Sequence, residues 1–562
     1  MPHAPPPCPD PRPLAPEAHP TVPASGAEAE LPLGEVSGRA VRATGALMGR
    51  QLVVRLINLV GFVVLARLLD PGTFGIFAVV RFVVYFLGRV SDAGLSATLL
   101  RKAEAVTEAE LRTVFTIQQA AVAVAVTGLW IGAPWIAQVY PELGPEHVWL
   151  LRVLGIGLVL ASLRTIPRVL IQRALRHDKL AVIDVAEVVA YYVVTVGLAA
   201  GGLGVWALVW GTLARGLVAT LGLLSVAWWR PGFAFDRETA REVLRFGVPI
   251  QLASFVTLAK ESVVPVLVLS MFGPVAVGVV NWARTLADSA VGQPLTLMGK
   301  VQLRVFGRIQ GDRQRLRSAV ERSVSLGAAI VAFPAALVLA QSGALVEFVV
   351  GEKWVPALPL LYLLTPAFLL RIVGSVYQQA LKAVGEGVTM LVNASIMFVT
   401  QGAVLWLLAG PVARPLWERG VGSALGVEAY AVAFFVSQAL VVMHAAHRLR
   451  RYARPRWGRG VAGPLAAGSI SAAAMWGGLH AVPNPWAIVP AALLGAGVYT
   501  SALGLLAGRR FGREVRVLAH AAGSGRAAAW ADSFGSALAR LDARRGGSDA
   551  SATVPTPSKV AP

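Results

Sequence analysis

Charged residues lie inside several long apolar stretches of this sequence. A charge near the centre of a bilayer costs about 2.5 to 3.5 kcal/mol on insertion scales, so charges that are retained there usually face a cavity or a partner. The basic residues that lie deepest in such stretches are Arg55, Arg81, Lys260 and Arg284. Arg50 and Arg371 are further cationic candidates, although Arg50 could also extend its side chain to the membrane surface. Because guanidinium and ammonium groups bind phosphate oxygens strongly, these residues predict a site for an anionic substrate.

Two acidic residues accompany the basic ones and are candidates for coupling transport to protons or Na⁺. Glu261 directly follows Lys260, but adjacent residues of a helix diverge by about 100°, so the two need not neutralise each other. Asp288 lies four residues after Arg284, a spacing at which the two side chains could pair as a structural clamp or a proton-sensitive switch.

The residues needed for cofactor or covalent chemistry are missing from the sequence. Cys8 is the only cysteine, so neither an internal disulfide nor a zinc site built from several thiolates can form. His444 and His447 have no further ligand types nearby, so no metal site is expected. The sequence contains no G-x-x-x-x-G-K-[ST] loop and no Ser/His/Asp set with motif-like spacing. We therefore expect no cofactor and no enzymatic activity.

The composition indicates a membrane protein. Of 562 residues, 56% are hydrophobic and 15% are charged, and the mean hydropathy is +0.63, whereas about a quarter of the residues in a soluble domain are charged. A net charge of +20 would suggest nucleic acid in a soluble protein. The apolar stretches make a membrane the better explanation, and no nucleic-acid partner is expected.

Fourteen apolar segments are long enough to cross a bilayer, which requires about 17 to 25 residues each. The predicted fold is therefore an all-α polytopic membrane protein. The segments span residues 46–68, 74–99, 113–138, 148–169, 182–202, 205–228, 247–271, 276–298, 323–348, 356–380, 388–409, 424–446, 461–481 and 486–507.

Basic residues alternate between the loops and predict the orientation in the membrane. Loops after even-numbered segments are rich in Arg and Lys, as at residues 101–102, 304–317 and 448–459, whereas the other loops carry few, with Lys353, Arg414 and Arg419 as exceptions. Basic loops stay on the cytoplasmic side. Both termini are then cytoplasmic: a proline-rich tail over residues 1–40 and a basic tail over 508–562, which could touch anionic membrane lipid.

A repeated motif divides the chain into two halves. Pro71, Gly75 and Arg81 recur with the same spacing as Pro274, Gly278 and Arg284. Because six segments separate the copies, both halves begin on the same side, and the repeat is parallel with a pseudo-twofold axis along the membrane normal. We expect an N-lobe over residues 41–229, a connecting loop over 230–246, a C-lobe over 247–450, and two extra spans over 451–507.

Four segments, in order, resemble bacterial polysaccharide-biosynthesis and O-antigen flippases of the multidrug/oligosaccharidyl-lipid/polysaccharide exporter superfamily. They are LARLLDPGTFGIFA (65–78), DAGLSATLLRKAEAVTEAELRTVF (92–115), WWRPGFAFDRETAREVLRFGVP (228–249) and VVGEKWVPALPLLYLL (349–364). The resemblance implies two six-helix lobes around a central cavity that opens alternately to the two sides of the bacterial inner membrane. By span, Arg50 or Arg55 and Arg284 match places where that superfamily keeps cavity arginines.

The resemblance also implies a substrate. Relatives of this kind move undecaprenyl-diphosphate-linked oligosaccharides to the outer leaflet, and polysaccharide polymerases or other assembly proteins would be partners. In this reading Arg55, Arg81, Lys260 and Arg284 bind the diphosphate and part of the sugar. The alternatives are a drug/cation antiporter of the same superfamily, which cavity cations disfavour, a membrane polymerase or ligase, which would need a larger outward loop, and a non-catalytic scaffold.

Overall fold

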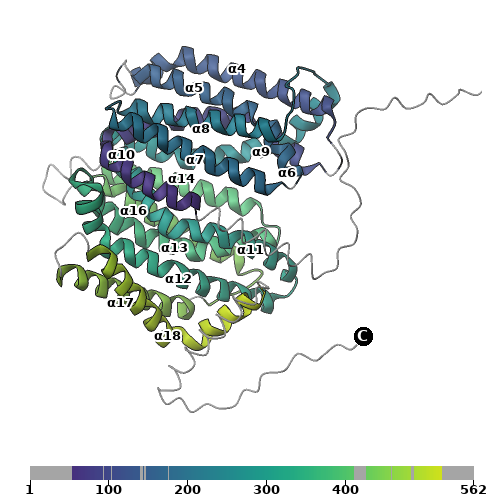
Figure 1. Cartoon of the computed structure of the whole chain (residues 1–562). Coiled ribbons are helices and arrows are strands. Elements are labelled where there is room, and N and C mark those ends of the chain that lie inside the picture. Colours follow the sequence, from purple (N-terminus) through teal and green to yellow (C-terminus); the bar gives the residue numbers. More distant parts are fainter. Residues whose placement is uncertain are drawn as a thin grey trace, which may run out of the picture.

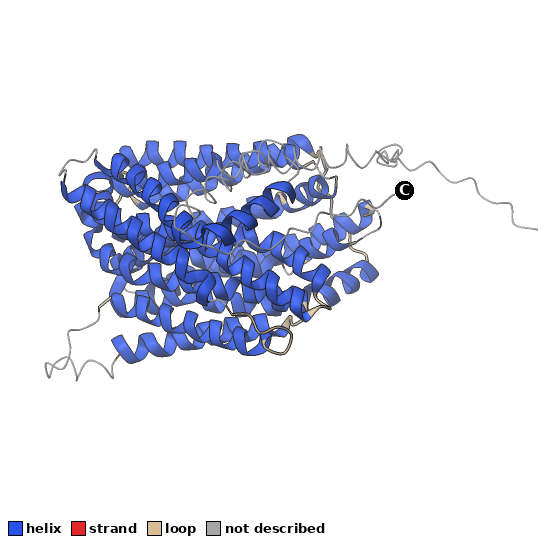
Figure 2. Cartoon of the chain, turned by 90° about the horizontal axis from the view of Figure 1, so that it is seen from below, coloured by secondary structure: helices blue, strands red, loops and turns tan. Residues whose placement is uncertain are grey.

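The computed structural model describes residues 53–92, 94–102, 104, 106–139, 144, 147–174, 176–410, 426–456, 458–481 and 487–521. Throughout these ranges the regular elements are helices and no strand occurs (Figures 1 and 2). A bilayer favours this outcome because a helix satisfies its own backbone N–H and C=O groups where no water is present. The all-α prediction is confirmed. Arg50, the 1–40 tail and residues 522–562 lie outside the described ranges.

The N-lobe consists of a helix over residues 53–68 and the elements that follow it as far as residue 226. These are α2 (Pro71–Asp92), α3 (Leu95–Arg101), α4 (Glu108–Val139), α5 (Val148–Leu163), α6 (Thr165–Arg173), α7 (His177–Ala200) and α8 (Val205–Val226). A core that includes Val80, Leu154 and Leu208 joins α2, α5 and α8. In Figure 1 these helices form the upper part of the molecule.

The C-lobe follows an extended connection that ends at residue 236. Its elements are α9 (Arg237–Ser262), η2 (Val263–Val268), α10 (Leu269–Ala287), η3 (Asp288–Gly292), α11 (Gln293–Ile309), α12 (Arg313–Ala344), η4 (Leu345–Val350), η5 (Glu352–Ala357), α13 (Leu358–Ala383), α14 (Val388–Ala409) and α16 (Glu428–Leu449). The first turns of α9 fall within the segment predicted to connect the lobes. There Val243 packs against Leu99 and Phe115 of the N-lobe.

The two extra spans form a hairpin on the outside of the C-lobe. α17 (Gly458–Ala481) and α18 (Ile488–Ala521) pack on α12 and occupy the lower edge of Figure 1. The Tyr499 hydroxyl donates to the Ala329 carbonyl at 2.5 Å, and Ser471 donates to the Gly495 carbonyl at 2.8 Å. The hairpin is therefore fixed to α12 by a hydrogen bond and by packing.

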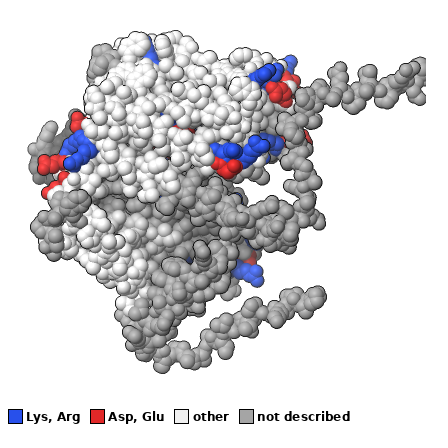
Figure 3. Space-filling view, in the orientation of Figure 1, with Lys and Arg blue, Asp and Glu red and all other residues white. Residues whose placement is uncertain are grey.

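Length and hydropathy identify eleven of the described helices as able to cross a membrane. One of the eleven, Leu258–Ile309, contains two predicted spans, which meet at a turn where Gly273 has φ 79° and Pro274 follows. The helix over 53–68 and α17, which fall outside the eleven, coincide with the remaining two predicted spans. On the face shown in Figure 3, charged side chains gather mainly at the two ends of the helices and leave an uncharged band between them.

The two copies of the repeated motif meet directly. A Cβ added to Gly75 of α2 would lie 1.7 Å from the Pro274 carbonyl oxygen, and one added to Gly278 of α10 would lie 1.8 Å from the Pro71 carbonyl oxygen. Only glycine permits two backbones to approach this closely. The contact is reciprocal, as expected of equivalent positions related by a pseudo-twofold axis. It lies at the outer end, which we define as the end that holds residues 69–71, 273–274 and 349–354; the opposite end is the inner end.

Candidate functional site

Five charged side chains gather in the C-lobe around the break between α9 and α10. Lys260 lies within electrostatic range of the other four, which are Glu261, Arg284, Asp288 and Arg371. They come from the last turn of α9, from α10, from the first residue of η3, and from α13. Asp288 begins the π-helical turn η3, and Glu261 lies two residues before the π-helical turn η2. Such turns are rare in proteins and are frequent at functional sites. The structure thus brings together Lys260 and Arg284 of the predicted substrate site, both predicted coupling acids, and Arg371.

Asp288 forms its ion pair with Arg371. The Arg371 Nη1 to Asp288 Oδ1 distance is 2.7 Å, and each side chain is about one third exposed. The predicted pairing of Asp288 with Arg284 is therefore replaced by a pair between η3 and α13, although Arg284 and Asp288 still attract each other over a longer distance. Gly292 makes room for the pair, because a Cβ there would lie 2.0 Å from Asp288 Oδ1 and 3.1 Å from Arg371 Nη1.

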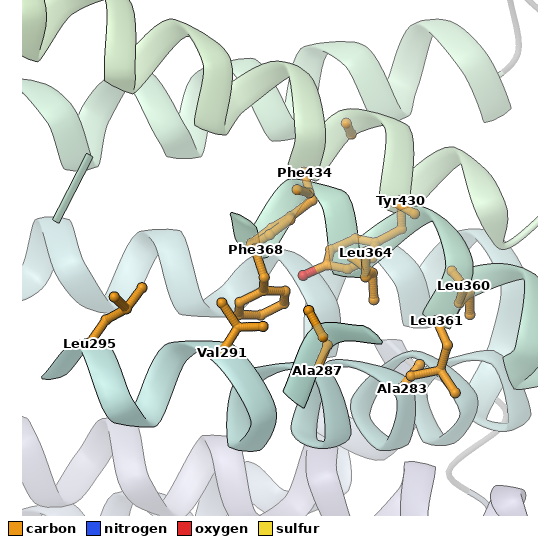
Figure 4. Packing of buried hydrophobic residues seen from close by; sticks show 14 of the residues in the cluster. Ala283, Ala287, Val291, Leu295, Leu360, Leu361, Leu364, Phe368, Tyr430 and Phe434 are labelled. Atoms are coloured by element: carbon orange, nitrogen blue, oxygen red, sulfur yellow. The ribbon is translucent and has the colours of Figure 1, made fainter. Parts of the chain in front are cut away.

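Arg284 has a different partner, the phenol of Tyr430 on α16. The Tyr430 hydroxyl lies close enough to its guanidinium to interact with it electrostatically. Tyr430 is 1% exposed and packs against Phe434, with 6.2 Å between the ring centroids. In Figure 4 the Tyr430 hydroxyl points toward the helix that carries Ala283 and Ala287. Arg284 lies between these two alanines in the sequence. The phenol therefore lies beside the guanidinium, and the part of the structure that is described shows no carboxylate paired with Arg284.

After these pairings the cluster keeps an excess of positive charge. Its three cations and two acids carry a net charge of +1 when all are ionised. Within the described part of the chain, Lys260 and Arg284 form no ion pair of the kind that joins Asp288 and Arg371. Both side chains are partly exposed although they lie deep in the protein. An anion that reaches them would meet two cations without displacing a carboxylate.

The N-lobe cations predicted for the same site stand apart from this cluster. Arg55 is half-buried, and its Nη2 atom is enclosed without a hydrogen-bond partner in the described part of the structure. Arg81 is exposed and lies within electrostatic range of Tyr191 on α7. Among the described residues no hydrogen bond or ion pair links either arginine to the C-lobe cluster. A ligand that spans the two lobes would be needed to use all four predicted cations.

A second polar site, which the sequence reasoning missed, lies inside the N-lobe near its inner end. A cavity of about 380 Å³ is lined by polar residues that include Ser162, Arg164 and Arg168, and by apolar ones that include Leu158 and Val169. Arg168 pairs with Asp184 at 3.1 Å, and Arg215 pairs with Glu187 at 2.6 Å. The sequence did contain a signal for this site. Arg164, Arg168 and Arg215 lie in the apolar spans on either side of the one that carries Asp184 and Glu187.

Contacts between the lobes close the outer end. Trp354 Nε1 donates to the Ala66 carbonyl at 2.8 Å, and Lys353 Nζ donates to the Arg67 carbonyl at 3.0 Å. The Trp354 ring also packs edge-on against Phe74 at 5.4 Å between centroids. Lys353, an exception to the predicted charge pattern of the outer loops, therefore has a structural contact here.

Comparison with known proteins places the chain in a family. A family model described as "Polysaccharide biosynthesis protein" matches residues 64–359, which is more than half of the chain. The chain belongs to the polysaccharide biosynthesis protein family. The relationship predicted from the four sequence segments is confirmed.

Relatives and solved structures agree with this membership. The chain is 26% identical over 324 residues to the lipopolysaccharide biosynthesis protein WzxC of Escherichia coli, covering 57% of this chain and 65% of WzxC. It is 29% identical over 352 residues to the succinoglycan biosynthesis transport protein ExoT of Rhizobium meliloti, covering 61% and 69% of the two chains. The chain thus spans about two thirds of the length of each relative.

Two solved structures share the fold. The lipid II flippase MurJ in an inward closed conformation matches with a TM-score of 0.62 at 12% identity, over 81% of this chain and 97% of that chain. An inward-facing multidrug resistance transporter of the MATE family, in the MOP superfamily, matches with a TM-score of 0.56 at 17% identity, over 71% and 95%. These identities support the fold and not a shared substrate.

Proposed function

We propose that this protein is a flippase for a polyprenyl-diphosphate-linked oligosaccharide, and that it acts as a transporter and not as an enzyme. The observation that carries the proposal is the pair of cations, Lys260 and Arg284, which form no ion pair within the described part of the C-lobe. The relatives are named for lipopolysaccharide biosynthesis and for succinoglycan transport. The proposed setting is the bacterial inner membrane, with both termini in the cytoplasm.

The chemistry of the substrate explains why such a site is needed. A diphosphate and a sugar chain are too polar to cross hydrocarbon, whereas a polyprenyl chain can stay in lipid throughout. Arg284 offers the diphosphate a planar set of N–H donors, and Lys260 offers a mobile ammonium. Arg55 and Arg81 are proposed to bind the substrate from the N-lobe once it lies between the lobes. Glu261 and Asp288 stay candidates for coupling to protons or Na⁺.

Alternation of the two lobes is proposed as the transport step. The outer end is closed by Trp354, Lys353 and the crossing of Gly75 with Gly278. Opening this end while the inner end closes would present the bound headgroup to the outer leaflet. The rocking would leave the hairpin of α17 and α18 in place on α12.

The excess of cations argues against the alternative of a drug/cation antiporter, because such a substrate would itself be cationic. A polymerase or ligase would need catalytic groups at a membrane surface, and a scaffold would not need deep cations. The flippase therefore accounts for more of the observations than the other candidates.

The proposal is tested in proteoliposomes with a fluorescent undecaprenyl-diphosphate oligosaccharide whose exposure in each leaflet is followed. We expect wild type to move the probe, and Arg284→Ala and Lys260→Ala each to slow it at least tenfold. Arg315→Ala is the matched control, because Arg315 is exposed and its ion pair is with Asp312, outside the cationic cluster. Absence of flipping above empty vesicles with several lipid-linked glycans would contradict the flippase assignment. Equal rates in all variants would contradict the cationic site.

A further inference from the structure

An apolar crevice lies between the lobes, beside the cationic cluster. Phe82, Val83 and Phe86 of α2 line one side, and residues 255, 258, 259 and 262 of α9 line the other. Its volume is about 410 Å³, within the range of about 300 to 1,000 Å³ that is typical of small-molecule sites. The rings of Phe86 and Phe255, one from each side, are tilted by 48° to each other with 6.2 Å between their centroids.

The walls of the crevice offer nothing to a polar ligand. Its lining side chains are apolar except for Ser262, whose hydroxyl already donates to the Ala259 carbonyl at 2.7 Å. Phe255, Leu258, Ala259 and Ser262 follow one face of α9 because they are spaced three and four residues apart. Apolar surface of this kind binds hydrocarbon and excludes ions and water.

The depth of the crevice matches one leaflet. Phe86 and Phe82 precede Asp92, the last residue of α2, by six and ten residues, which is about 9 and 15 Å along a helix. Half of a hydrocarbon core is about 15 Å thick. Toward the inner end, Gln251 Nε2 donates to the Arg89 carbonyl at 2.8 Å and joins α9 to α2. The crevice therefore occupies the half of the membrane that is nearer the inner end.

The cationic cluster at the depth of the crevice indicates what kind of apolar ligand would bind. Lys260 directly follows Ala259, so the crevice and the cationic cluster lie on neighbouring faces of α9 at one depth. An ordinary lipid chain would use the crevice alone. A molecule with an anionic group joined directly to a long apolar chain would use both surfaces at once.

We propose that this crevice binds the first isoprene units of the polyprenyl chain while the attached diphosphate lies at Lys260 and Arg284. The inference rests on the proposed function and adds a binding site for the chain. It assigns Phe86, Phe255 and Ala259 to recognition of the lipid, which makes the protein select a polyprenyl carrier and not only a diphosphate.

The direct test is photo-crosslinking from the crevice. Benzoylphenylalanine replaces Phe86 or Phe255 in the full chain, in vesicles of phosphatidylethanolamine and phosphatidylglycerol that contain undecaprenyl diphosphate. Val124 of α4, which is 74% exposed, provides the matched lipid-facing position. We expect the ratio of prenyl to phospholipid adducts to be at least tenfold higher in the crevice than at position 124. Equal ratios would mean that the crevice holds ordinary membrane lipid, and would overturn the proposal.

A second test compares ligands with and without a prenyl chain. Ala259→Trp fills the crevice, and we expect it to weaken binding of undecaprenyl diphosphate about tenfold while binding of a diphosphate sugar that carries no isoprene unit is unchanged. Retained binding of the prenyl-free probe establishes that the variant is folded. Val193→Trp, at a 66% exposed position of α7, is the control. An equal loss of affinity for both probes, or no loss for either, would overturn the crevice site. Failure of wild type to flip the fluorescent undecaprenyl-diphosphate oligosaccharide would instead contradict the proposed function.

Discussion

At the scale of single residues, the deep cations differ in how they are held. Arg371 forms an ion pair with Asp288, whereas Arg284 forms none among the described residues and lies beside the hydroxyl of Tyr430. We therefore propose a structural role for Arg371 and a binding role for Arg284, although both lie in apolar spans.

The first prediction concerns the hydroxyl of Tyr430, which lies beside Arg284. We expect Tyr430→Phe to weaken binding of undecaprenyl diphosphate about two- to tenfold, because a hydrogen bond between Arg284 and this hydroxyl would contribute about 0.5 to 1.5 kcal/mol. Binding is measured by fluorescence with the purified protein in micelles. The ring of Tyr430 packs in the core and is retained, so thermal stability is expected to change little. Unchanged affinity would mean that Arg284 needs no positioning.

The second prediction concerns the pair of Asp288 and Arg371. We expect Arg371→Met and Asp288→Asn each to lower the free energy of unfolding, and the double variant to lose less than the sum. The coupling is expected to be about 1 kcal/mol, because both side chains are about one third exposed. Denaturant titration of the four proteins in micelles measures it. Strict additivity would contradict a structural ion pair.

The third prediction concerns Glu386, in the loop between α13 and α14. The hydrogen bond from Arg448 lowers the pKa of this carboxyl, and hydrogen bonds from Tyr452 and Thr389 act in the same direction. A lowered pKa in the folded state stabilises the protein above the ordinary carboxyl pKa, and the stabilisation is lost as the pH falls through the lowered value. Glu386→Gln is therefore expected to melt at a lower temperature than wild type at pH 7, and this difference should shrink below about pH 4.

The control for this pH effect is Glu352→Gln, at an exposed position in η5. Its melting temperature should follow that of wild type at both pH values. A Glu386→Gln difference that is the same at pH 7 and at pH 3.5 would contradict the assignment of the effect to the ionised carboxylate.

Of the predicted site residues, the structure brings those of the C-lobe together and leaves Arg55 and Arg81 apart from them, and the sequence did not indicate their partners. Lys260, Arg284 and both predicted coupling acids come together because they lie at similar distances before and after the turn at Gly273, on two adjacent spans, which spacing alone could indicate. Tyr430 lies on α16, more than 140 positions further along the chain, and no local pattern connects it with Arg284. The partner of Asp288 was missed for the same reason, since Arg371 comes from α13.

At the scale of elements, the crossing of α2 and α10 is the closest contact between the lobes that the structure describes. The sequence predicted the repeated Pro-x-x-x-Gly motif but not that its two copies would touch. The reciprocal distances at Gly75 and Gly278 explain why both copies keep glycine. The helices of the structure also agree with the predicted spans, because an apolar segment in a bilayer can satisfy its backbone hydrogen bonds in few ways other than a helix.

The fourth prediction concerns a methyl group added at the crossing of α2 and α10. Gly75→Ala is expected to force α2 and α10 apart, because the added Cβ would lie 1.7 Å from a backbone oxygen that cannot move cheaply. In a Cys8→Ser background, Gly72→Cys should then react several-fold faster with an impermeant maleimide. Gly128→Ala is the control, since a Cβ there meets no atom within 4 Å. Unchanged labelling in Gly75→Ala would mean that the crossing does not keep the outer end closed.

At the scale of the whole molecule, the contacts divide into those that transport must break and those that it can keep. The outer contacts of Trp354, Lys353 and Gly278 join one lobe to the other. The contacts of Tyr499 and Ser471 lie within the hairpin of α17 and α18 and its support. If the lobes rock, only the first group has to open. The sequence predicted the lobes, but it contained no signal for which end would be closed.

The central claim, that the outer contact must open to flip the lipid-linked glycan, is tested most directly with a reversible cross-link. A Cβ at Gly72 would lie 3.5 Å from Val275 Cγ2, close enough for a Gly72→Cys/Val275→Cys disulfide between the lobes. Gly478→Cys/Ala491→Cys, with 3.8 Å between the Cβ positions, is the control within the α17–α18 hairpin. In proteoliposomes we predict that oxidation of the first pair abolishes flipping of the fluorescent undecaprenyl-diphosphate oligosaccharide and that reduction restores it, while the control pair flips throughout. Flipping at the wild-type rate with the first pair fully oxidised would contradict the account.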